Sequence, residues 1–483
     1  MLSANSVSGN DKSTKKGPQI LAALAACMGA FGLGTVLGYS SPAMSQLRDH
    51  PDFGAFYENG TLIGEGVSWQ PASWIGSLVA LGALISGPVI GFCVEAFGRK
   101  TTIMALALPF VIGWMLITYA WNLQMIYAGR FVTGFCGGAF SLAAPVYIGE
   151  TAEDSIRGLL GAGFNLMIAI GILFTYIVGI IAPWDWLAVI CACSPMALVS
   201  LMMFAPESPR WLISQGKHIE AIESLRWLRG ASSSQVVEEE FLAIQRSVDD
   251  SKLNSASLKD FTHPSILKPT LICMALMLFQ QLSGVNAVIF YTTDIFTDAG
   301  SSLAPSMCTV IIGTVQVLAS LVSSLLMDKA GRKVLLLFSD LVMSLFLVGL
   351  GFFFYLKEFN PEFAAQIGWL PLASLIAFII AMSVGFGPIP WLMMGELLPP
   401  HVKGQASAMA TSFNWLLAFL VTFFFEDVKQ TVGSYSCYWA FAGICALGTV
   451  FVYIFVPETK GKSLDEIQKS FEKGNAKSRV MDA

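Results

Sequence analysis

The stretch EAFGRK at Glu95–Lys100 returns as DKAGRK at Asp328–Lys333, in the second half of this 483-residue chain. Two further charged motifs repeat in the same order. Glu150 and Arg157 return as Glu396 and Lys403, and Pro206–Ser208 returns as Pro457–Thr459. A single repeat of this kind would carry little weight, but three in register indicate that one unit has been duplicated.

Composition shows that the duplicated unit is membrane-embedded. Hydrophobic residues make up 55% of the chain and charged residues 13%, with a mean hydropathy of +0.65. Apolar runs of about 20 residues match a hydrocarbon layer about 30 Å thick. Twelve such runs predict an all-α protein with twelve transmembrane helices, at residues 19–39, 73–94, 102–120, 124–147, 159–181, 186–205, 269–291, 305–327, 334–356, 369–393, 404–425 and 437–456.

The repeats divide these spans into two pseudo-symmetric halves of six helices, which is an architecture of transporters with a central site. The central segment has Ile222, Leu225 and Leu228 at helical spacing, so a small helical linker is predicted there. It is interpreted as a plain connection or as a latch that braces one conformation. The predicted regions are a tail (1–18), the first half (19–205), the linker (206–268), the second half (269–456) and a second tail (457–483).

Positive charges gather on one side of the predicted spans. They include Lys12, Lys15, Arg99, Arg157 and Arg332, whereas the loops of the other side carry few. The positive-inside rule places both termini and the linker in the cytoplasm. The sequon at Asn59 then falls on the outer side, where glycosylation is expected.

Uncharged amides at membrane depth form the predicted binding site. They lie in four spans: Asn165, Gln280, Gln281, Asn286, Gln316 and Asn414. Each side-chain amide offers two donors and an acceptor, which suits a ligand with many hydroxyl groups. A single amide would as readily bridge two helices, but so many favour a site. Trp391 follows a proline-rich break at Gly385–Pro390, where it stacks on a sugar ring or anchors the chain at the interface.

Acidic groups are scarce at depth in the first half. Apart from Arg130 and Glu150 its spans carry essentially no ionisable residue, and span 1 reads Gly38-Tyr39-Ser40 with no acid. Proton coupling normally requires an intramembrane carboxylate or histidine. The sequence therefore favours a passive facilitator, and it indicates no enzyme, no cofactor, no metal and no nucleic-acid partner.

The repeated charges predict a conformational switch. Gly98 permits a tight turn, from which Arg99 can reach Glu150 or Glu207, and the second half repeats this set. Rings of ion pairs that form when the inner ends close would bias the two states by about 1–3 kcal/mol. The residues assigned to the switch are Glu95, Arg99, Glu150, Arg157, Glu207, Asp328, Arg332, Glu396, Lys403 and Glu458.

The full motif set resembles the sugar porter family of the major facilitator superfamily. The resemblance rests on Pro145–Glu150, Pro206–Trp211, Gln280–Asn286, Gly385–Trp391 and Pro457–Gly461. Ala287–Thr292 and Pro390–Glu396 are similar to the insect facilitated trehalose transporter branch, and His401–Gly404 to animal intracellular-type glucose transporters.

The resemblance implies a hexose site at Gln280, Gln281, Asn286, Gln316, Trp391 and Asn414, with Asn165 from the first half. Family glucose carriers often have glutamine at Asn165, glutamate at Ser383 and asparagine at Gln316. The sugar is therefore left open among trehalose, glucose and fructose.

The prediction is a monomeric sugar uniporter of the plasma membrane or an internal membrane, working by alternating access. A proton-driven symporter and a non-transporting sugar sensor remain as alternatives.

Overall fold

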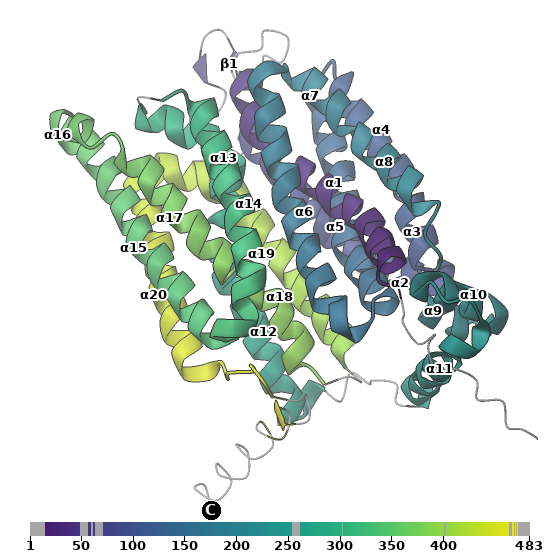
Figure 1. The fold of residues 1–483 in the computed structure, drawn as a ribbon. Helices are drawn as coiled ribbons and strands as arrows, with labels where there is room; N and C mark the ends of the chain where they lie inside the picture. The colour runs from purple at the N-terminus through teal and green to yellow at the C-terminus, as the bar shows by residue number, and fades with distance from the viewer. Residues whose placement is uncertain are drawn as a thin grey trace, which may run out of the picture.

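The computed structural model describes residues 15–48, 57–58, 61–62, 71–253, 261–301, 303–399, 402–462, 466–467, 469 and 471. These residues are almost entirely helical (Figure 1). Twelve helical segments are long and apolar enough to cross a membrane, which confirms the predicted all-α membrane fold. Several extend beyond the predicted apolar runs, the first reaching Leu47 and the seventh covering Pro264–Ala299.

The first six spans comprise eight helices, because spans 3 and 6 are each interrupted once. These helices are α1 (Gly17–Arg48), α2 (Pro71–Phe97), α3 (Arg99–Ala105), α4 (Ala107–Thr118), α5 (Leu123–Thr151), α6 (Asp154–Ile181), α7 (Trp184–Cys191) and α8 (Cys193–Met202). The central segment then forms α9 (Pro209–Ser214), α10 (His218–Arg229), the 3₁₀ helix η2 (Ser234–Val237) and α11 (Glu238–Leu253).

The last six spans repeat this plan, with interruptions in spans 7 and 10. Their helices are α12 (Pro264–Leu282), α13 (Val285–Ala299), α14 (Pro305–Ala330), α15 (Arg332–Phe359), α16 (Pro361–Gln366), α17 (Leu370–Val384), α18 (Ile389–Leu397), α19 (Lys403–Val432) and α20 (Ser434–Phe455). The short α16 is a connection and does not form a span of its own.

Figure 1 shows the early helices on one side of the molecule and the late helices on the other. Within the first group α1 packs on α6 and α2 on α5, and within the second α15 packs on α20. Contacts between α2 and α19, α6 and α14, and α1 and α13 join the two groups. The candidate site lies among helices at this junction.

The two ends of the bundle are distinct. We call the end with α9, α10 and α11 the linker end, and the opposite end the hairpin end (Figure 1). The hairpin end is named for β1 (Tyr57–Glu58) and β2 (Thr61–Leu62), which form a two-stranded antiparallel sheet that the sequence did not predict. Asn59 lies outside the described residues.

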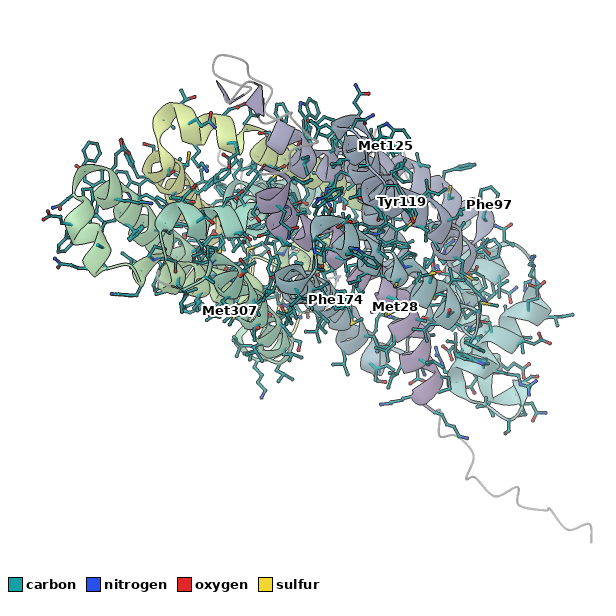
Figure 2. All side chains as sticks on the ribbon, turned by 90° about the horizontal axis from the view of Figure 1, so that it is seen from above. Met28, Phe97, Tyr119, Met125, Phe174 and Met307 are labelled. Carbon is teal, nitrogen blue, oxygen red and sulfur yellow. The ribbon has the colours of Figure 1, made fainter. Side chains whose placement is uncertain are left out.

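The outside of the bundle is apolar, as a lipid-facing surface must be. Phe97, Tyr119 and Met307, labelled in Figure 2, are each more than half exposed. Small residues and aromatic rings fill the interior instead, and the fully buried Trp114, Tyr147 and Tyr291 are among its largest side chains.

Candidate transport site and charge networks

Four of the predicted amides form one hydrogen-bonded chain. Asn286 Nδ2 donates to Gln281 Oε1 at 2.6 Å, and Gln281 Nε2 donates to Asn414 Oδ1 at 3.1 Å. Asn414 Nδ2 in turn donates to Gln280 Oε1 at 2.9 Å. The chain therefore crosses from α13 over α12 to α19, and all four side chains are buried.

The break between α12 and α13 places Asn286 in this chain. Ser283 and Gly284 end α12, and Gly284 adopts a left-handed conformation before α13 begins. The last turn of α12 carries Gln280 and Gln281, and the first turn of α13 carries Asn286. A straight helix would set these amides on neighbouring sectors, whereas the turn lets Asn286 bond back to Gln281.

The amide chain ends at the proline-rich break of span 10. Gln280 Nε2 donates to the carbonyl of Phe386 at 2.6 Å and to that of Gly387 at 2.9 Å. Trp391 lies on α18 just beyond this break and is half-buried against the apolar core. The amides and the interrupted helix thus form one connected unit.

Asn165 and Gln316 occupy helices that meet at the junction of the two groups. Asn165 lies on α6 and Gln316 on α14, and these helices pack together. Within the described residues, no hydrogen bond joins either side chain to the amide chain. The Gln316 Oε1 atom is buried without a hydrogen-bond partner there, so its acceptor is available to a ligand.

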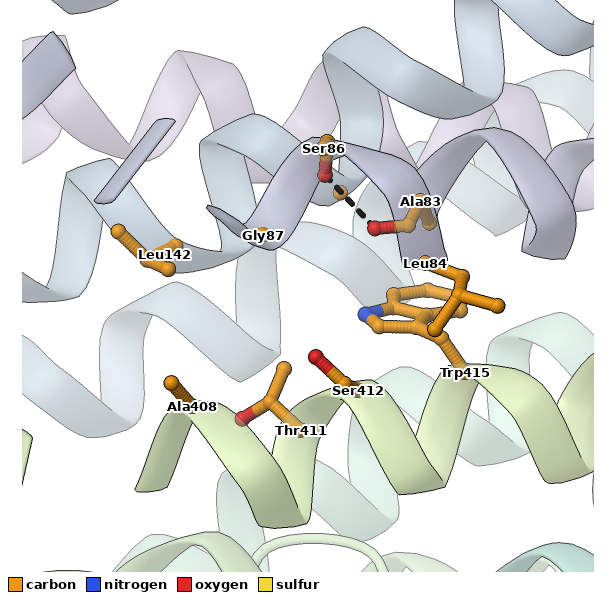
Figure 3. Close-up of a pocket in the computed structure, with 10 residues that line it drawn as sticks. Ala83, Leu84, Ser86, Gly87, Leu142, Ala408, Thr411, Ser412 and Trp415 are labelled. Atoms are coloured by element: carbon orange, nitrogen blue, oxygen red, sulfur yellow. Dashed lines mark hydrogen bonds between the residues drawn. The ribbon is translucent and has the colours of Figure 1, made fainter. Parts of the chain in front are cut away.

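Trp415 was missed by the sequence analysis, which singled out only the neighbouring Asn414. Its ring lines a small pocket between α2 and α19, together with Ala83, Ser86 and Ser412 (Figure 3). Its Nε1 atom is buried and has no hydrogen-bond partner in the part of the chain that the structure describes. A buried donor without a partner, one residue after Asn414, makes Trp415 a further candidate site residue.

Arg130 is fully buried, and its charge is held by backbone and hydroxyl oxygens. It donates to the carbonyls of Ile75 and Val36 at 3.0 and 2.9 Å and to Ser40 Oγ at 2.5 Å. Among the described residues no carboxylate pairs with it. Ser40 therefore occupies the position from which an acid would neutralise this guanidinium.

Asp340 is a second residue that the sequence analysis missed. It lies in α15 with no exposed surface, packed against Gly448 of α20. Neither of its carboxyl oxygens has a hydrogen-bond partner in the described residues. The only sequence signal is an aspartate inside an apolar span of the second half, whereas the scarcity of acids that favours a passive facilitator is a feature of the first half.

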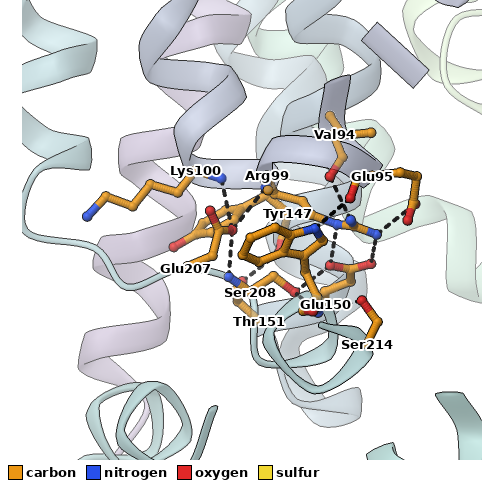
Figure 4. Close-up of polar contacts among 12 residues, drawn as sticks. Val94, Glu95, Arg99, Lys100, Tyr147, Glu150, Thr151, Glu207, Ser208 and Ser214 are labelled. Carbon is orange, nitrogen blue, oxygen red and sulfur yellow. Dashed lines mark hydrogen bonds and ion pairs between the residues drawn. The ribbon is translucent and has the colours of Figure 1, made fainter. Parts of the chain in front are cut away.

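At the linker end, Arg99 is the centre of a charge network (Figure 4). Its Nε and Nη2 atoms donate to the two oxygens of Glu150, each at 2.9 Å, and Nη2 also reaches Glu95 at 3.0 Å. Ser208 Oγ donates to Glu150 Oε2 at 2.5 Å. Glu207 accepts from the backbone N–H groups of Arg99 and Lys100, both at 3.0 Å, and so caps α3.

The second half repeats these contacts. Arg332 donates to Glu396 Oε1 at 3.2 Å from Nε and 3.1 Å from Nη2, and Thr459 Oγ1 donates to Glu396 Oε2 at 2.5 Å. Glu458 accepts from the backbone of Arg332 and Lys333 at 3.0 and 3.1 Å. Gly98 and Gly331 precede the capped helices with φ of 100° and 94°, a region that favours glycine.

Two other residues assigned to the switch lie apart from these contacts. Arg157 pairs with Asp154 at 2.6 Å, on its own helix. Lys403 Nζ donates to the carbonyl of Gly395 at 2.8 Å. The side chain of Asp328 lies outside the described residues. In this conformation the described switch residues around Arg99 and Arg332 form two compact networks, one in each group of helices.

Hydrogen bonds join the two groups of helices toward the hairpin end. Ser41 Oγ on α1 lies 2.8 Å from Thr293 Oγ1 on α13. Tyr176 on α6 donates to the carbonyl of Ile289 at 2.9 Å. These contacts hold the halves together near the hairpin end in this conformation.

Comparison with known proteins finds relatives over nearly the whole chain. A family model described as "Sugar (and other) transporter" matches residues 22–471. A facilitated trehalose transporter of Culex quinquefasciatus is 42% identical over 93% of this chain and 85% of its own length. One from Polypedilum vanderplanki is also 42% identical, over 93% of this chain and 87% of its own length.

Other relatives are longer. The facilitated trehalose transporter of Anopheles gambiae is 41% identical, and the match covers only 56% of that protein, so the chain spans about half the length of such relatives. Among solved structures, the proton:xylose symporter XylE with 6-bromo-6-deoxy-D-glucose has a TM-score of 0.78 at 24% identity, covering 95% of this chain and 100% of that chain. The inward open form of XylE from E. coli has a TM-score of 0.76 at 23% identity, covering 92% and 98%.

Proposed function

Because this chain belongs to the sugar transporter family of the major facilitator superfamily, we propose that it carries a sugar across a membrane by facilitated diffusion. The observation that carries the proposal is the uncharged amide chain of Gln280, Gln281, Asn286 and Asn414. Its amide–amide bonds can be exchanged for bonds to sugar hydroxyls at little net cost, since each group keeps a partner. Trp391, Trp415, Asn165 and Gln316 complete the proposed site.

The carrier works by alternating access, with the two halves moving about the bound sugar. The Ser41–Thr293 and Tyr176–Ile289 bonds close the hairpin end and must break when that end opens. The networks of Arg99 and Arg332 brace the linker end of each half. Contact between these two braced ends changes the balance between the outward-facing and inward-facing states. A difference of about 1–3 kcal/mol is enough for such a bias.

The substrate we favour is trehalose, with hexoses as the other candidates. The support is that relatives of 41–42% identity are facilitated trehalose transporters. Uptake of labelled trehalose, glucose and fructose into proteoliposomes containing the purified chain tests this. The proposal requires saturable uptake that reaches the outside concentration, and absence of uptake for all three sugars would refute it.

Asp340 favours a second candidate function, proton-coupled sugar transport. An unpartnered carboxyl buried in a span is expensive, and such groups mark ion pathways. Coupled transport predicts uphill accumulation that a protonophore abolishes and that Asp340→Asn removes. If sugar with both the unmodified chain and Asp340→Asn only reaches equal concentrations inside and outside, facilitated diffusion is the function.

The chain is an integral multi-pass membrane protein, and its orientation is part of the proposal. We place the linker end in the cytoplasm, because Arg99, Lys100, Arg332 and Lys333 all gather there. Asn59 then faces outward as a glycosylation site in a monomer of the plasma membrane. Glycosidase treatment should lower the mass of the unmodified chain and leave that of Asn59→Gln unchanged. Both tails should also resist protease added to intact cells, and these two results together would support this orientation.

A further inference from the structure

The break between α17 and α18 leaves two carbonyls without their helical donors. Pro388 and Pro390 have no backbone N–H, so Val384 and Phe386, each four residues earlier, lose the donor that a continuous helix would supply. A carbonyl left without a partner inside a membrane is costly, so other groups must supply donors.

Side chains from neighbouring helices supply those partners. Ser323 Oγ on α14 donates to the carbonyl of Val384 at 3.2 Å. Gln280 Nε2 on α12 donates to the carbonyl of Phe386 at 2.6 Å. The freed N–H of Phe386 donates to Ser339 Oγ on α15 at 3.1 Å, and that hydroxyl donates to the carbonyl of Ala381 at 2.8 Å.

The two serines hold the break in a fixed place. Ser339 is fully buried, and it lies so close to Gly385 that an added Cβ there would come within 2.4 Å of the Ser339 Cβ. Neither serine takes part in the amide chain. Gln280 differs, because its Oε1 accepts from Asn414 while its Nε2 holds Phe386. One side chain thus connects the candidate sugar site to the break.

We propose that Gln280 is a positioning residue that links sugar binding to movement of α18. When a sugar hydroxyl accepts from Gln280 Nε2, the carbonyl of Phe386 loses its hydrogen-bond donor and α18 becomes free to pivot. Ser323 and Ser339 keep their hydrogen bonds to α17 and the break, so these do not move. The inference rests on the proposed function, because it needs a ligand with acceptor oxygens at the amide chain.

Hydrogen–deuterium exchange of the α18 amides in the purified full-length chain tests the link. At a pH where the introduced carboxyl is ionised, Gln280→Glu keeps an acceptor for Asn414 but has no donor for Phe386. Without sugar, exchange across Ile389–Leu397 should rise about 5- to 150-fold, the effect of one buried group losing its partner. Gln46→Glu is the matched control, because Gln46 on α1 also accepts from one group, the Trp184 N–H, and donates to a backbone carbonyl, that of Ala182, and neither bond involves the break.

Sugar should raise this exchange in the unmodified chain and should add nothing in Gln280→Glu. In Ser339→Ala, exchange should start high and still respond to sugar, because the Gln280 contact remains. If Gln280→Glu does not fold, Gln280→Met is used with the same expectation. Equilibrium binding of labelled trehalose and glucose is measured on the same samples.

If the unmodified chain binds sugar without any change in exchange of the α18 amides, the inference is overturned and the proposed function still stands. A sugar response that survives in Gln280→Glu would do the same. A folded chain that binds neither sugar would overturn the proposed function, and the inference with it.

Discussion

At the scale of single residues, Gln281 and Asn286 already use each other as partners, at a distance of 2.6 Å. The sequence offered two interpretations of such amides, as bridges between helices or as ligand contacts. The geometry shows the bridge, and sugar binding requires that the bridge be exchanged. The two interpretations therefore describe the same side chains in different states of occupancy.

Replacing Gln281 or Asn286 by alanine tests the ligand contact. We expect affinity for the transported sugar to fall about 5- to 150-fold, because each loss leaves a hydroxyl unpartnered in a partly desolvated site, at a cost of about 1–3 kcal/mol. Affinity is measured per molecule of folded carrier. Gln19→Ala is the control, because Gln19 bonds only to Glu153 at the linker end, so only stability should change. Unchanged affinity in both site variants would place the site on another helix.

Single-residue chemistry is also where sequence reasoning stopped short. Gln280, Gln281, Asn286 and Asn414 stood out because amides are rare in apolar spans. Trp415 and Asp340 did not, because a tryptophan is common in such spans and an isolated aspartate gives no indication of its surroundings. That each lacks a hydrogen-bond partner among the described residues becomes visible only when the neighbouring helices are in place.

At the scale of elements, the repeated motifs turn out to be helix-capping devices as well as ion pairs. Glu207 and Glu458 each accept from the first N–H groups of the helix that follows a positive-φ glycine. Carboxylates at this position are favoured by the helix dipole. The sequence predicted that the charges would meet, but capping depends on backbone directions that a motif does not reveal.

Arg99→Gln and Arg332→Gln test whether these networks bias transport. Each removes a partly buried partner of Glu150 or Glu396, so we expect the balance of conformations to shift about 5- to 150-fold and uptake to slow. Affinity for sugar on the outer side should stay within a few-fold. Lys100→Gln is the control, because its Nζ contacts only the carbonyl of Met203 at an exposed position. Normal uptake in both arginine variants would mean that these charges set the orientation of the chain in the membrane and do not bias transport.

Glu458 predicts a pH dependence of stability. Burial alone would raise its pKa, but backbone hydrogen bonds from Lys460, Arg332, Lys333 and Thr459 outweigh burial and lower the pKa from 4.5. A lowered folded-state pKa gives stability that is present above pH 4.5 and is lost as the pH falls toward the folded value. The melting temperature of the detergent-solubilised chain should therefore fall less steeply with acid in Glu458→Gln than in the unmodified chain. Identical slopes in the two proteins would contradict this.

At the scale of the whole molecule, the fold was the easiest property to predict. Twelve apolar runs and three repeated motifs are long-range signals that survive variation at single positions, and the twelve spans are present. The breaks in spans 3 and 6 were not predicted, because they carry no proline-rich signal like that at Gly385–Pro390. The contacts near the hairpin end also escaped prediction, because ordinary hydroxyls such as Ser41 and Thr293 make them.

Coupling is a property of the whole carrier. Because Ser40 and not an acid faces Arg130, we expect uptake to stop when inside and outside concentrations are equal and to change little under an imposed pH gradient. Net uptake of labelled sugar into sugar-free proteoliposomes, with and without that gradient, measures this. Accumulation above the outside concentration that disappears with the gradient would refute it and point to Asp340.

The central helices have a consequence for how the chain can be divided. Arg229 of α10 donates to the carbonyl of Thr151, lies 3.5 Å from Glu153 and accepts from the backbone of Lys15, so this segment is fastened to the first half. Each charge network likewise closes within its own half. Residues 1–253 and 254–483, expressed together as two polypeptides, should therefore associate in the bilayer and restore sugar uptake. The peptide bond between residues 253 and 254 would then be dispensable for transport.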